Sequence, residues 1–330
     1  MACLLLPDPQ GHCMATSEAW LIANPSAGRK VGFTVNPAGP DQARAALERH
    51  GLSCRLRLTE RAGHATELAR QALADGAELV VAAGGDGTIH EVAEALIGHD
   101  VPMAIMPLGS MLNLGRSLNV PRDLDAAARI VAERRIVRMD VGRATTSTSA
   151  RLFLEGAGVG FEAGLFAYSS RIDAGRRRAI RLLWRFVVRY SPRSLVLTVD
   201  GQSEVVRRAF MVGVAITPYI GLALNAAPDA KIDDRQFDVV VRQGATWRQL
   251  LRHMLALALG RPHEPTTRLL RGRAVEIQGL RRQLLVHADG ELLGRTPARF
   301  ELLPAALPVV VGQPLPGAVS AIAGPIDHAA

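Results

Sequence analysis

Lysine is nearly absent from this sequence of 330 residues, in which Lys30 and Lys231 are the only two. The formal net charge of +8 therefore comes almost entirely from arginine. Such a charge favours polyanionic partners, and nucleotides, nucleic acid and anionic lipid all qualify. The sequence also has no Gly-x-x-x-x-Gly-Lys-Ser/Thr stretch, which excludes a P-loop enzyme.

Cysteine is scarce as well. The three cysteines have neither the paired spacing of a metal site nor the even number of a disulfide framework; they are Cys3, Cys13 and Cys54. A reducing compartment is the simpler interpretation, so we expect the protein in the cytoplasm.

Long apolar runs are missing too. The longest, such as Met254–Leu259, fall far short of the roughly 20 residues that cross a bilayer, so no spanning segment is expected. The short apolar run at Leu4–Leu6 is followed by two prolines and preceded by no basic flank. Residues 1–17 are therefore interpreted as a loose tail and not as a signal peptide.

What is present falls into two halves with different patterns. From Trp20 to about Val141, β-like runs alternate with helical patterns, as in a parallel, doubly wound sheet. The strands expected there are Trp20–Ala23, Cys54–Leu58, Leu79–Ala83 and Met103–Met106, and the helices Asp41–His50 and His64–Asp75. The later half favours mostly antiparallel β-structure, with strands at Leu195–Val199, Ala209–Ile216, Phe237–Val241, Ala274–Ile277 and Leu284–His287 and helices at 177–190 and 246–259.

These patterns predict two domains between two tails. The first is an α/β domain at residues 18–143, and the second a β-rich domain at residues 144–313, whose last strands are candidates to return to the first domain. The boundary is placed in Ala144–Ala150, because its Thr and Ser residues indicate a loop or a sheet edge. Residues 314–330 are rich in Pro, Gly and Ala, so a flexible tail is expected.

The most informative segment runs from an apolar strand into Gly84, Gly85, Asp86, Gly87 and Thr88 and then into an amphipathic helix. Glycines let the backbone approach a bulky anion, and the amides and dipole at a helix start favour negative charge. Asp86 would repel a bare phosphate, which favours a divalent cation between the two. The alternative is a tight turn without a ligand.

Two neighbouring strands are expected to end in loops of similar chemistry. One loop is Asn24–Arg29 and the other is Pro107–Ser110. In doubly wound sheets ligands bind beyond the carboxyl ends of the strands, where all three loops must gather. The sequence therefore predicts a phosphate-binding site at this edge of the sheet.

Asp289 and Glu291 form a second candidate constellation. Residues two apart in an extended segment face the same side, so both carboxylates can enter one cleft and serve a substrate hydroxyl. The alternative is an ordinary hairpin turn, of which Asp-Gly is the commonest signal.

The segments Asn24–Arg29, Gly84–Thr88 and Pro107–Arg116 together resemble the diacylglycerol kinase catalytic-domain family, which includes bacterial lipid kinases and sphingosine and ceramide kinases. Weaker matches occur at Ala227–Asp238 and around Asp289, so the resemblance covers roughly residues 20–312. It implies an α/β nucleotide-binding domain followed by a β-sandwich-like domain, with the active site in the cleft between them.

The resemblance also implies roles for particular residues. Asp289 or Glu291 would be the general base, with Asp289 favoured and the choice left open. Asp86 would act through Mg²⁺, and a second Mg²⁺ would lie at Asp234 with the backbone carbonyls of Lys231 and Gln236. The residues expected to contact ATP are Asn24, Thr59, Gly84, Gly85, Asp86, Gly87, Thr88, Ile89, His90 and Ser110.

The sequence departs from the family at three places. Leu112 stands where the family has an amide side chain, so a nucleotide contact is either lost or taken over by Asn113. Arg235 replaces the glycine that usually follows the metal-binding aspartate, which leaves a solvated turn as an equal alternative there. His90 stands where the family often has Asn.

A basic segment at Arg171–Arg193 carries eight arginines and a single acid. Within it Ile180, Leu183, Trp184 and Val187 share one helical face, so docking on an anionic membrane and packing on the β domain are equal alternatives. Nucleic acid is not expected as a partner, because the segment matches no recognised reading module. The oligomeric state is left open, with a homodimer as one candidate.

The function expected from this sequence is transfer of the ATP γ-phosphate to a hydroxyl of diacylglycerol or a related lipid alcohol. The protein would be cytoplasmic and peripherally associated with the membrane. Two alternatives are retained. One is a kinase of a soluble substrate, since NAD kinases share a Gly-Gly-Asp-Gly loop, and the other is a non-catalytic nucleotide or lipid sensor, suggested by Leu112 and Arg235.

Overall fold

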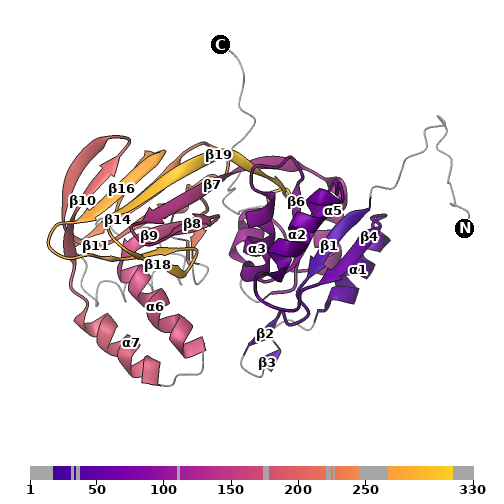
Figure 1. Cartoon of the computed structure of the whole chain (residues 1–330), viewed down its shortest axis with the longest axis horizontal. Helices are drawn as coiled ribbons and strands as arrows, with labels where there is room; N and C mark the ends of the chain where they lie inside the picture. Colours follow the sequence, from indigo (N-terminus) through magenta and orange to yellow (C-terminus); the bar gives the residue numbers. More distant parts are fainter. Residues whose placement is uncertain are drawn as a thin grey trace, which may run out of the picture.

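A computed structural model describes residues 18–30, 33–34, 38–109, 112–173, 178–220, 224–225, 227–244 and 267–314. An α/β domain and a β-sandwich-like domain lie side by side in it (Figure 1), which confirms the expected fold class. Residues 1–17, the helix expected at 246–259 and residues 315–330 lie outside the described residues. Within the described part of the chain, no helix is long and apolar enough to cross a membrane.

The first domain is built on a parallel sheet with the strand order β4-β1-β5-β6. Short apolar runs form β1 (Ala19–Ala23), β5 (Val80–Gly84) and β6 (Met103–Pro107), and alternating apolar and basic residues form β4 (Cys54–Leu58). All four strands match the expected positions to within one residue. Because the strands are parallel, the loops that follow them open at one edge of the sheet.

Helices cover both faces of this sheet, as the fully buried strands β1, β5 and β6 require. Alternate residues of β1 point to opposite faces, so Trp20 and Ile22 join one core while Leu21 joins the other. The first core is covered by α2 (His64–Ala74) and α3 (Asp86–Leu96), and the second by α1 (Pro40–Arg49) and α5 (Leu124–Glu133). The short helix α4 (Asn113–Ser117) follows β6.

The second domain consists of antiparallel strands and one helical hairpin. Its helices are α6 (Phe161–Asp173) and α7 (Arg178–Arg189), which project from the sheet in Figure 1. Its strands are β7 (Ile136–Thr146), β8 (Ala150–Phe153), β9 (Gly156–Gly160), β10 (Arg193–Val199), β11 (Gln202–Ala215), β14 (Phe237–Gln243), β15 (Thr267–Gly272), β16 (Ala274–Gly279), β17 (Leu285–Ala288), β18 (Glu291–Arg295) and β19 (Ala298–Val310). Two small ribbons, β2 (Arg29–Lys30) with β3 (Phe33–Thr34) and β12 (Tyr219–Ile220) with β13 (Leu224–Asn225), complete the described elements.

The two domains share one continuous sheet. Strand β19 pairs with β7 along most of its length and reaches the first domain, where Val309 lies beside Met103 of β6 in parallel. The segment Ala144–Ala150, where the sequence places the boundary at a loop or sheet edge, contains a turn between two paired strands. Ala144 is buried, and the segment is the end of β7, the turn at residues 147–149 and the start of β8.

Candidate active site

The three loops expected to gather at the carboxyl edge of the first sheet do meet there. Asn24 follows β1, and its Nδ2 donates to the Thr88 hydroxyl at 3.3 Å. The Gly109 N–H donates to the Gly84 carbonyl at 2.9 Å, which ties the loop after β6 to the loop after β5. Thr59 follows β4, and its N–H donates to the carbonyl of Ala23, the residue before Asn24.

Two glycines of this site approach each other closely. A Cβ on Gly109 would lie 2.4 Å from the Gly85 Cα, a distance that real side chains do not show. Gly85 is the N-cap residue of α3, and no side chain caps this helix. The helix start therefore offers backbone N–H groups and a positive dipole to an anion, as the sequence predicted for a phosphate.

Asp86 lies at the first turn of α3 and accepts two backbone hydrogen bonds. Its carboxylate receives the N–H groups of Leu112 at 3.3 Å and Asn113 at 3.1 Å. Burial raises the pKa of Asp86, an effect that the nearby His90 partly offsets. The same side chain thus holds the β6–α4 loop in place and presents a poorly solvated carboxylate at the phosphate loop.

Not every residue expected at the nucleotide is available to it. Ile89 is fully buried in the core between sheet and helices, so only its backbone can contribute. Leu112 is also in that core, and Asn113 directs its amide to Glu155 of the second domain, at 3.1 Å. Ser110 lies outside the described residues.

Asp289 and Gly290 form the hairpin turn between β17 and β18, with positive φ of 45° and 79°. The hairpin interpretation and the active-site interpretation are therefore compatible. The Asp289 side chain is only 2 % exposed, because its two oxygens accept the backbone N–H groups of Leu154, Glu155 and Gly156 at 2.7–3.0 Å. These three bonds fix the direction of the carboxylate.

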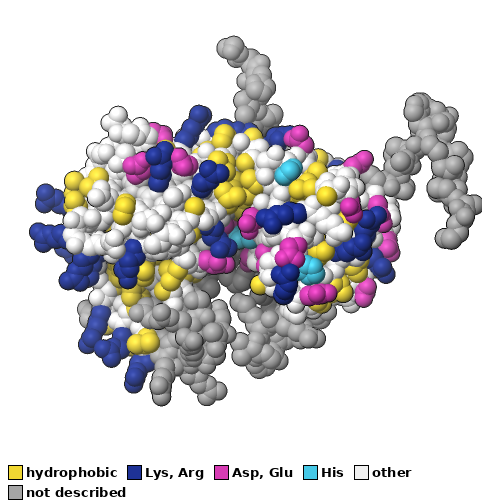
Figure 2. Space-filling model, viewed as in Figure 1, with side chains coloured by type: hydrophobic (Ala, Val, Ile, Leu, Met, Phe, Trp, Pro, Cys, Tyr) yellow, Lys and Arg dark blue, Asp and Glu magenta, His cyan; other side chains and the backbone are white. Residues whose placement is uncertain are grey.

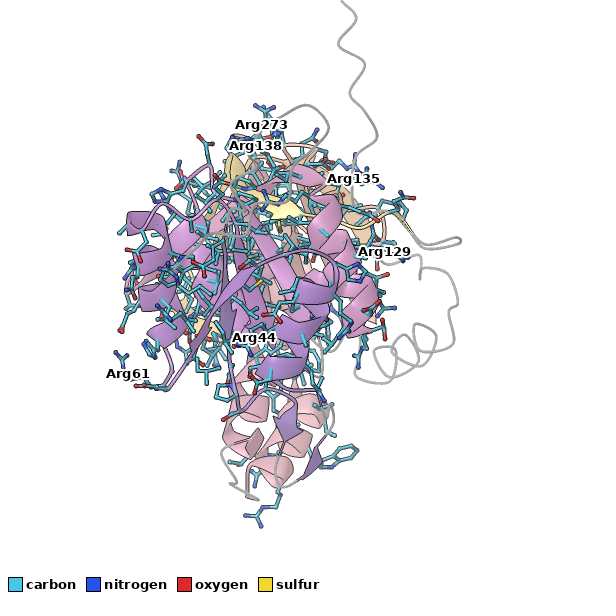
Figure 3. The ribbon with its side chains drawn as sticks, turned by 90° about the vertical axis from the view of Figure 1, so that its right-hand side faces the viewer. Arg44, Arg61, Arg129, Arg135, Arg138 and Arg273 are labelled. Atoms are coloured by element: carbon cyan, nitrogen blue, oxygen red, sulfur yellow. The ribbon has the colours of Figure 1, made fainter. Side chains whose placement is uncertain are left out.

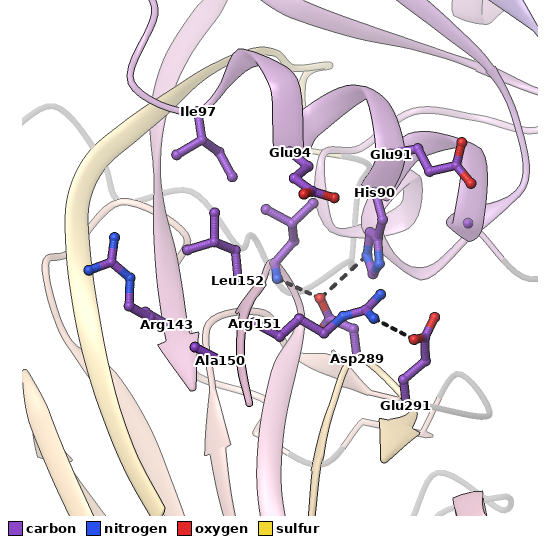
Figure 4. Close-up of a pocket in the computed structure, with 12 residues that line it drawn as sticks. His90, Glu91, Glu94, Ile97, Arg143, Ala150, Arg151, Leu152, Asp289 and Glu291 are labelled. Carbon is purple, nitrogen blue, oxygen red and sulfur yellow. Dashed lines mark hydrogen bonds and ion pairs between the residues drawn. The ribbon is translucent and has the colours of Figure 1, made fainter. Parts of the chain in front are cut away.

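Glu291 has a different environment from Asp289. Its carboxylate is mostly exposed and pairs with the guanidinium of Arg151 on β8. Both acids nevertheless line one cavity, as Figure 4 shows.

Glu155 was missed by the sequence interpretation. It is almost fully buried between the two domains, and burial, followed by the charges of Asp289 and Asp86, raises its pKa well above the ordinary value. The Nε2 atom of His90 lies 3.8 Å from Glu155 Oε1 and 3.6 Å from Asp289 Oδ2. His90, Glu155 and Asp289 thus connect the two domains at the base of the cleft.

The cavity at this cleft has a volume of about 480 Å³. His90, Glu91 and Glu94 line it from α3, and Asp289 and Glu291 from the opposite side (Figure 4). At its other end Ile97, Ala150 and Leu152 form apolar walls beside Arg143. The cavity therefore offers a charged end and an apolar end to one bound molecule.

The second predicted metal site lies in a different cluster. Asp234 accepts the Gln236 N–H at 3.2 Å, and burial raises its pKa. The neighbouring Arg235 has a φ of 65° and donates its guanidinium to the buried Asp140 at 2.5 Å. Arg235 therefore keeps the left-handed backbone that a glycine would adopt and brings its own positive charge to this turn.

The described residues contain no group of three or more His, Cys, Asp and Glu side chains arranged to hold a metal ion. This does not conflict with Mg²⁺ at a phosphate loop. Magnesium usually keeps several waters and binds one or two carboxylates together with substrate phosphates. Asp86, a poorly solvated carboxylate beside the helix start, fits that description.

The fold and this cleft define a two-domain kinase, and comparisons with known proteins agree. Residues 18–144 match the model of the diacylglycerol kinase catalytic domain, and residues 157–311 match the YegS C-terminal NAD kinase beta sandwich-like domain. The chain belongs to the diacylglycerol kinase catalytic-domain family, as the sequence motifs predicted.

Relatives and structures with similar folds cover most of the chain. A diacylglycerol kinase from Staphylococcus carnosus is 26 % identical over 293 residues, which are 86 % of this chain and 91 % of that protein. The diacylglycerol kinase of Staphylococcus haemolyticus is also 26 % identical, over 86 % of this chain and 84 % of that protein. A crystal structure of a diacylglycerol kinase from Bacillus anthracis str. Sterne, 20 % identical, superposes with a TM-score of 0.69 over 91 % of this chain and 98 % of that one. At this identity the superposition supports the fold alone.

Proposed function

We propose that this kinase transfers the γ-phosphate of ATP to a hydroxyl of diacylglycerol or a related lipid alcohol. One observation carries the proposal. A single cavity has the start of α3 on one side, the fixed carboxylate of Asp289 on the other and apolar walls at its far end. A hydroxyl carried on an apolar molecule suits that arrangement.

The nucleotide would bind at the edge of the first sheet. Its phosphates would lie against the Gly84–Thr88 loop, because the uncapped start of α3 offers N–H groups and the glycines allow close approach. Asn24 lies next to this loop and Thr59 follows β4, the strand beside β1, and these two are the other candidates for contact. Mg²⁺ would be held by Asp86, and when bound it would supply charge neutralisation at the phosphates.

Asp289 is the better candidate for the general base. Three backbone hydrogen bonds orient its carboxylate, so a substrate hydroxyl within reach would meet an acceptor of fixed direction. Glu291 is exposed and paired with Arg151, which suits a role in holding the acceptor or a metal. A second Mg²⁺ at Asp234, with the carbonyls of Lys231 and Gln236, stays a prediction.

The acceptor would enter from the apolar side of the cavity. Ile97 and Leu152 would contact its apolar part, while Asp289 receives the hydroxyl end. We also propose that the protein acts in the cytoplasm at the membrane surface, where such acceptors are found.

The test is transfer of labelled γ-phosphate from ATP to a mixed lipid extract with Mg²⁺, beside Asp289→Asn and Asp86→Asn proteins. The expected result is a labelled lipid that only the unmutated protein makes, and its identification gives the substrate. NAD is offered in a parallel reaction, because the second domain matches a model described as NAD kinase-like.

Two outcomes would overturn the proposal. Labelling of NAD without labelling of any lipid would favour a kinase of a soluble substrate. Demonstrable ATP binding without labelling of either acceptor would favour the sensor interpretation.

A further inference from the structure

Helix α7 presents a mixed apolar and basic face to solvent. Trp184 is 64 % exposed, and Val188, one turn further along, is exposed as well. The sequence placed Trp184 on the same face as Leu183 and Val187, but the packed face of the helix is centred on Phe186 and Tyr190. These two rings contact Phe161 at centroid distances of 5.5 and 5.1 Å.

Arginines surround this exposed tryptophan. Arg181, Arg185 and Arg189 project from α7 on the side next to Trp184, and all three are exposed. Arg189 also lines a cavity with Arg193, at the start of β10. We call Arg181, Trp184, Arg185, Val188, Arg189 and Arg193 the docking face.

The basic character continues beyond α7. Arg193 lines a further cavity of about 670 Å³ together with Arg207, Arg281 and Arg282, and no acid lines it. Leu280, at the rim of this cavity, is exposed. Figure 2 shows basic side chains gathered along the same outer edge of the second domain.

These arginines have no acidic partners in the part of the chain that the structure describes. No ion pair there involves Arg181, Arg185 or Arg189, nor the arginines of the adjoining cavity. In the first domain, by contrast, Arg49 pairs with Asp125 and Arg61 with Glu67. The outer edge of the second domain therefore carries uncompensated positive charge, which a polyanion would neutralise.

We propose that the docking face binds the surface of an anionic phospholipid bilayer. An exposed tryptophan between arginines favours a membrane over nucleic acid, because the ring can enter the headgroup region while the guanidinium groups contact lipid phosphates. This inference rests on the proposed function in one respect, namely that the acceptor is a membrane lipid.

Helix α6 connects the docking face to the active site. On one side Gly164 lies against Phe186 of α7, where a Cβ would be 2.0 Å from the ring. On the other side Phe166 lies against the Asp289–Gly290 turn, 3.3 Å from where a Gly290 Cβ would stand. A bilayer bound to α7 would thus lie one helix away from the carboxylate that receives the hydroxyl.

The test measures sedimentation of the full chain with vesicles of phosphatidylcholine, with and without phosphatidylglycerol. The wild-type protein should bind only the anionic vesicles, less so at high salt, and the emission of Trp184 should shift to shorter wavelength. The triple variant Arg181→Gln, Arg185→Gln, Arg189→Gln should partition about 100-fold less, and Trp184→Ala about tenfold less.

A matched control removes the same charge elsewhere. Arg44→Gln, Arg129→Gln and Arg135→Gln are substitutions on the first domain, and Figure 3 shows Arg129 and Arg135 well away from the α6–α7 hairpin in that view. This triple variant should bind anionic vesicles within about twofold of the wild type. Equal losses in both triple variants would overturn the docking face, since net charge alone would then explain binding.

A kinase assay on detergent-dispersed lipid separates the two proposals. The docking-face variants should keep wild-type turnover there and lose it on vesicles. Vesicle binding that depends on the docking face, without any lipid phosphorylation, would support docking and reject the lipid kinase. Phosphorylation in detergent without vesicle binding would reject docking alone, as would tighter binding of single-stranded RNA than of anionic vesicles.

Discussion

On the first-domain side of the cleft, Gly109 lies so close to Gly85 that a Cβ on Gly109 would stand 2.4 Å from the Gly85 Cα. On the second-domain side, Asp289 accepts three backbone N–H groups, and Glu155 accepts the amide of Asn113. In the proposed function the first side would recognise its ligand through backbone N–H groups and the absence of side chains, and the second through charge and proton position. Added volume should therefore damage the first side, and changed charge the second.

The largest effect is expected from Asp289→Asn. Removing the charge should lower kcat by about 10²–10⁴-fold if this carboxylate is the base. One amide N–H would also face the backbone donors of Leu154 to Gly156, which should cost about 1–3 kcal/mol of unfolding free energy. Single-turnover phosphate transfer and calorimetry measure the two effects. Unchanged kcat would assign the base to another residue.

The next largest effect is expected from Gly109→Ala, which adds volume on the first-domain side of the cleft. Its methyl group would stand 2.4 Å from the Gly85 Cα, so the phosphate loop has to shift. We expect loss of about 1–3 kcal/mol of unfolding free energy and at least about tenfold weaker ATP binding. Gly87→Ala is the control for stability, because its Cβ would meet no atom within 4 Å. Equal melting temperatures of the two variants would contradict the explanation by close approach.

A smaller and pH-dependent effect is expected from Glu155→Gln. Because the pKa of Glu155 is raised in the folded state, folded protein binds more protons than unfolded protein above about pH 4.5, and its stability falls as the pH rises. Glutamine removes this fall and still accepts from Asn113. The melting temperature of the variant minus that of the wild type should therefore increase from pH 4.5 upward. A difference that decreases with pH would show that Glu155 is ionised in the folded protein.

The smallest effect is expected from Glu291→Gln. This side chain is mostly exposed, and its pair with Arg151 is worth about 1 kcal/mol or less. The melting temperature should stay within about 2 °C of the wild type, and activity should fall by severalfold, mainly through KM. Arg151→Gln serves as the matched partner variant. A loss of kcat as large as that of Asp289→Asn would exchange the proposed roles of the two acids.

The sequence was sufficient for the features that follow local rules. Short apolar runs predicted β1, β5 and β6, and the parallel arrangement then required their loops to meet, as the bonds of Asn24 to Thr88 and Gly109 to Gly84 show. The Asp-Gly pair gave the β17–β18 turn, where Asp289 takes the left-handed conformation that such turns need.

Long-range packing could not be predicted in the same way. Glu155 follows the apolar residues of β8 without any motif, and only the fold places it beside His90 and Asn113. Likewise, helical periodicity defines an apolar stripe on α7 but does not say which edge of it packs. Phe161 and Phe210 decide this, because their rings receive Tyr190 and leave Trp184 outside.

Strand β19 also has a consequence for how this chain is made. Its residues are among the last of the described chain to leave the ribosome, yet Val309 pairs with Met103 at the edge of the first domain's sheet. Until β19 has been synthesised, β6 keeps an unpaired edge, and such edges pair with strands of other chains and promote aggregation. A nascent chain that ends before β19 would therefore carry a complete phosphate loop on an unfinished sheet, and premature termination should yield aggregates rather than a free nucleotide-binding domain.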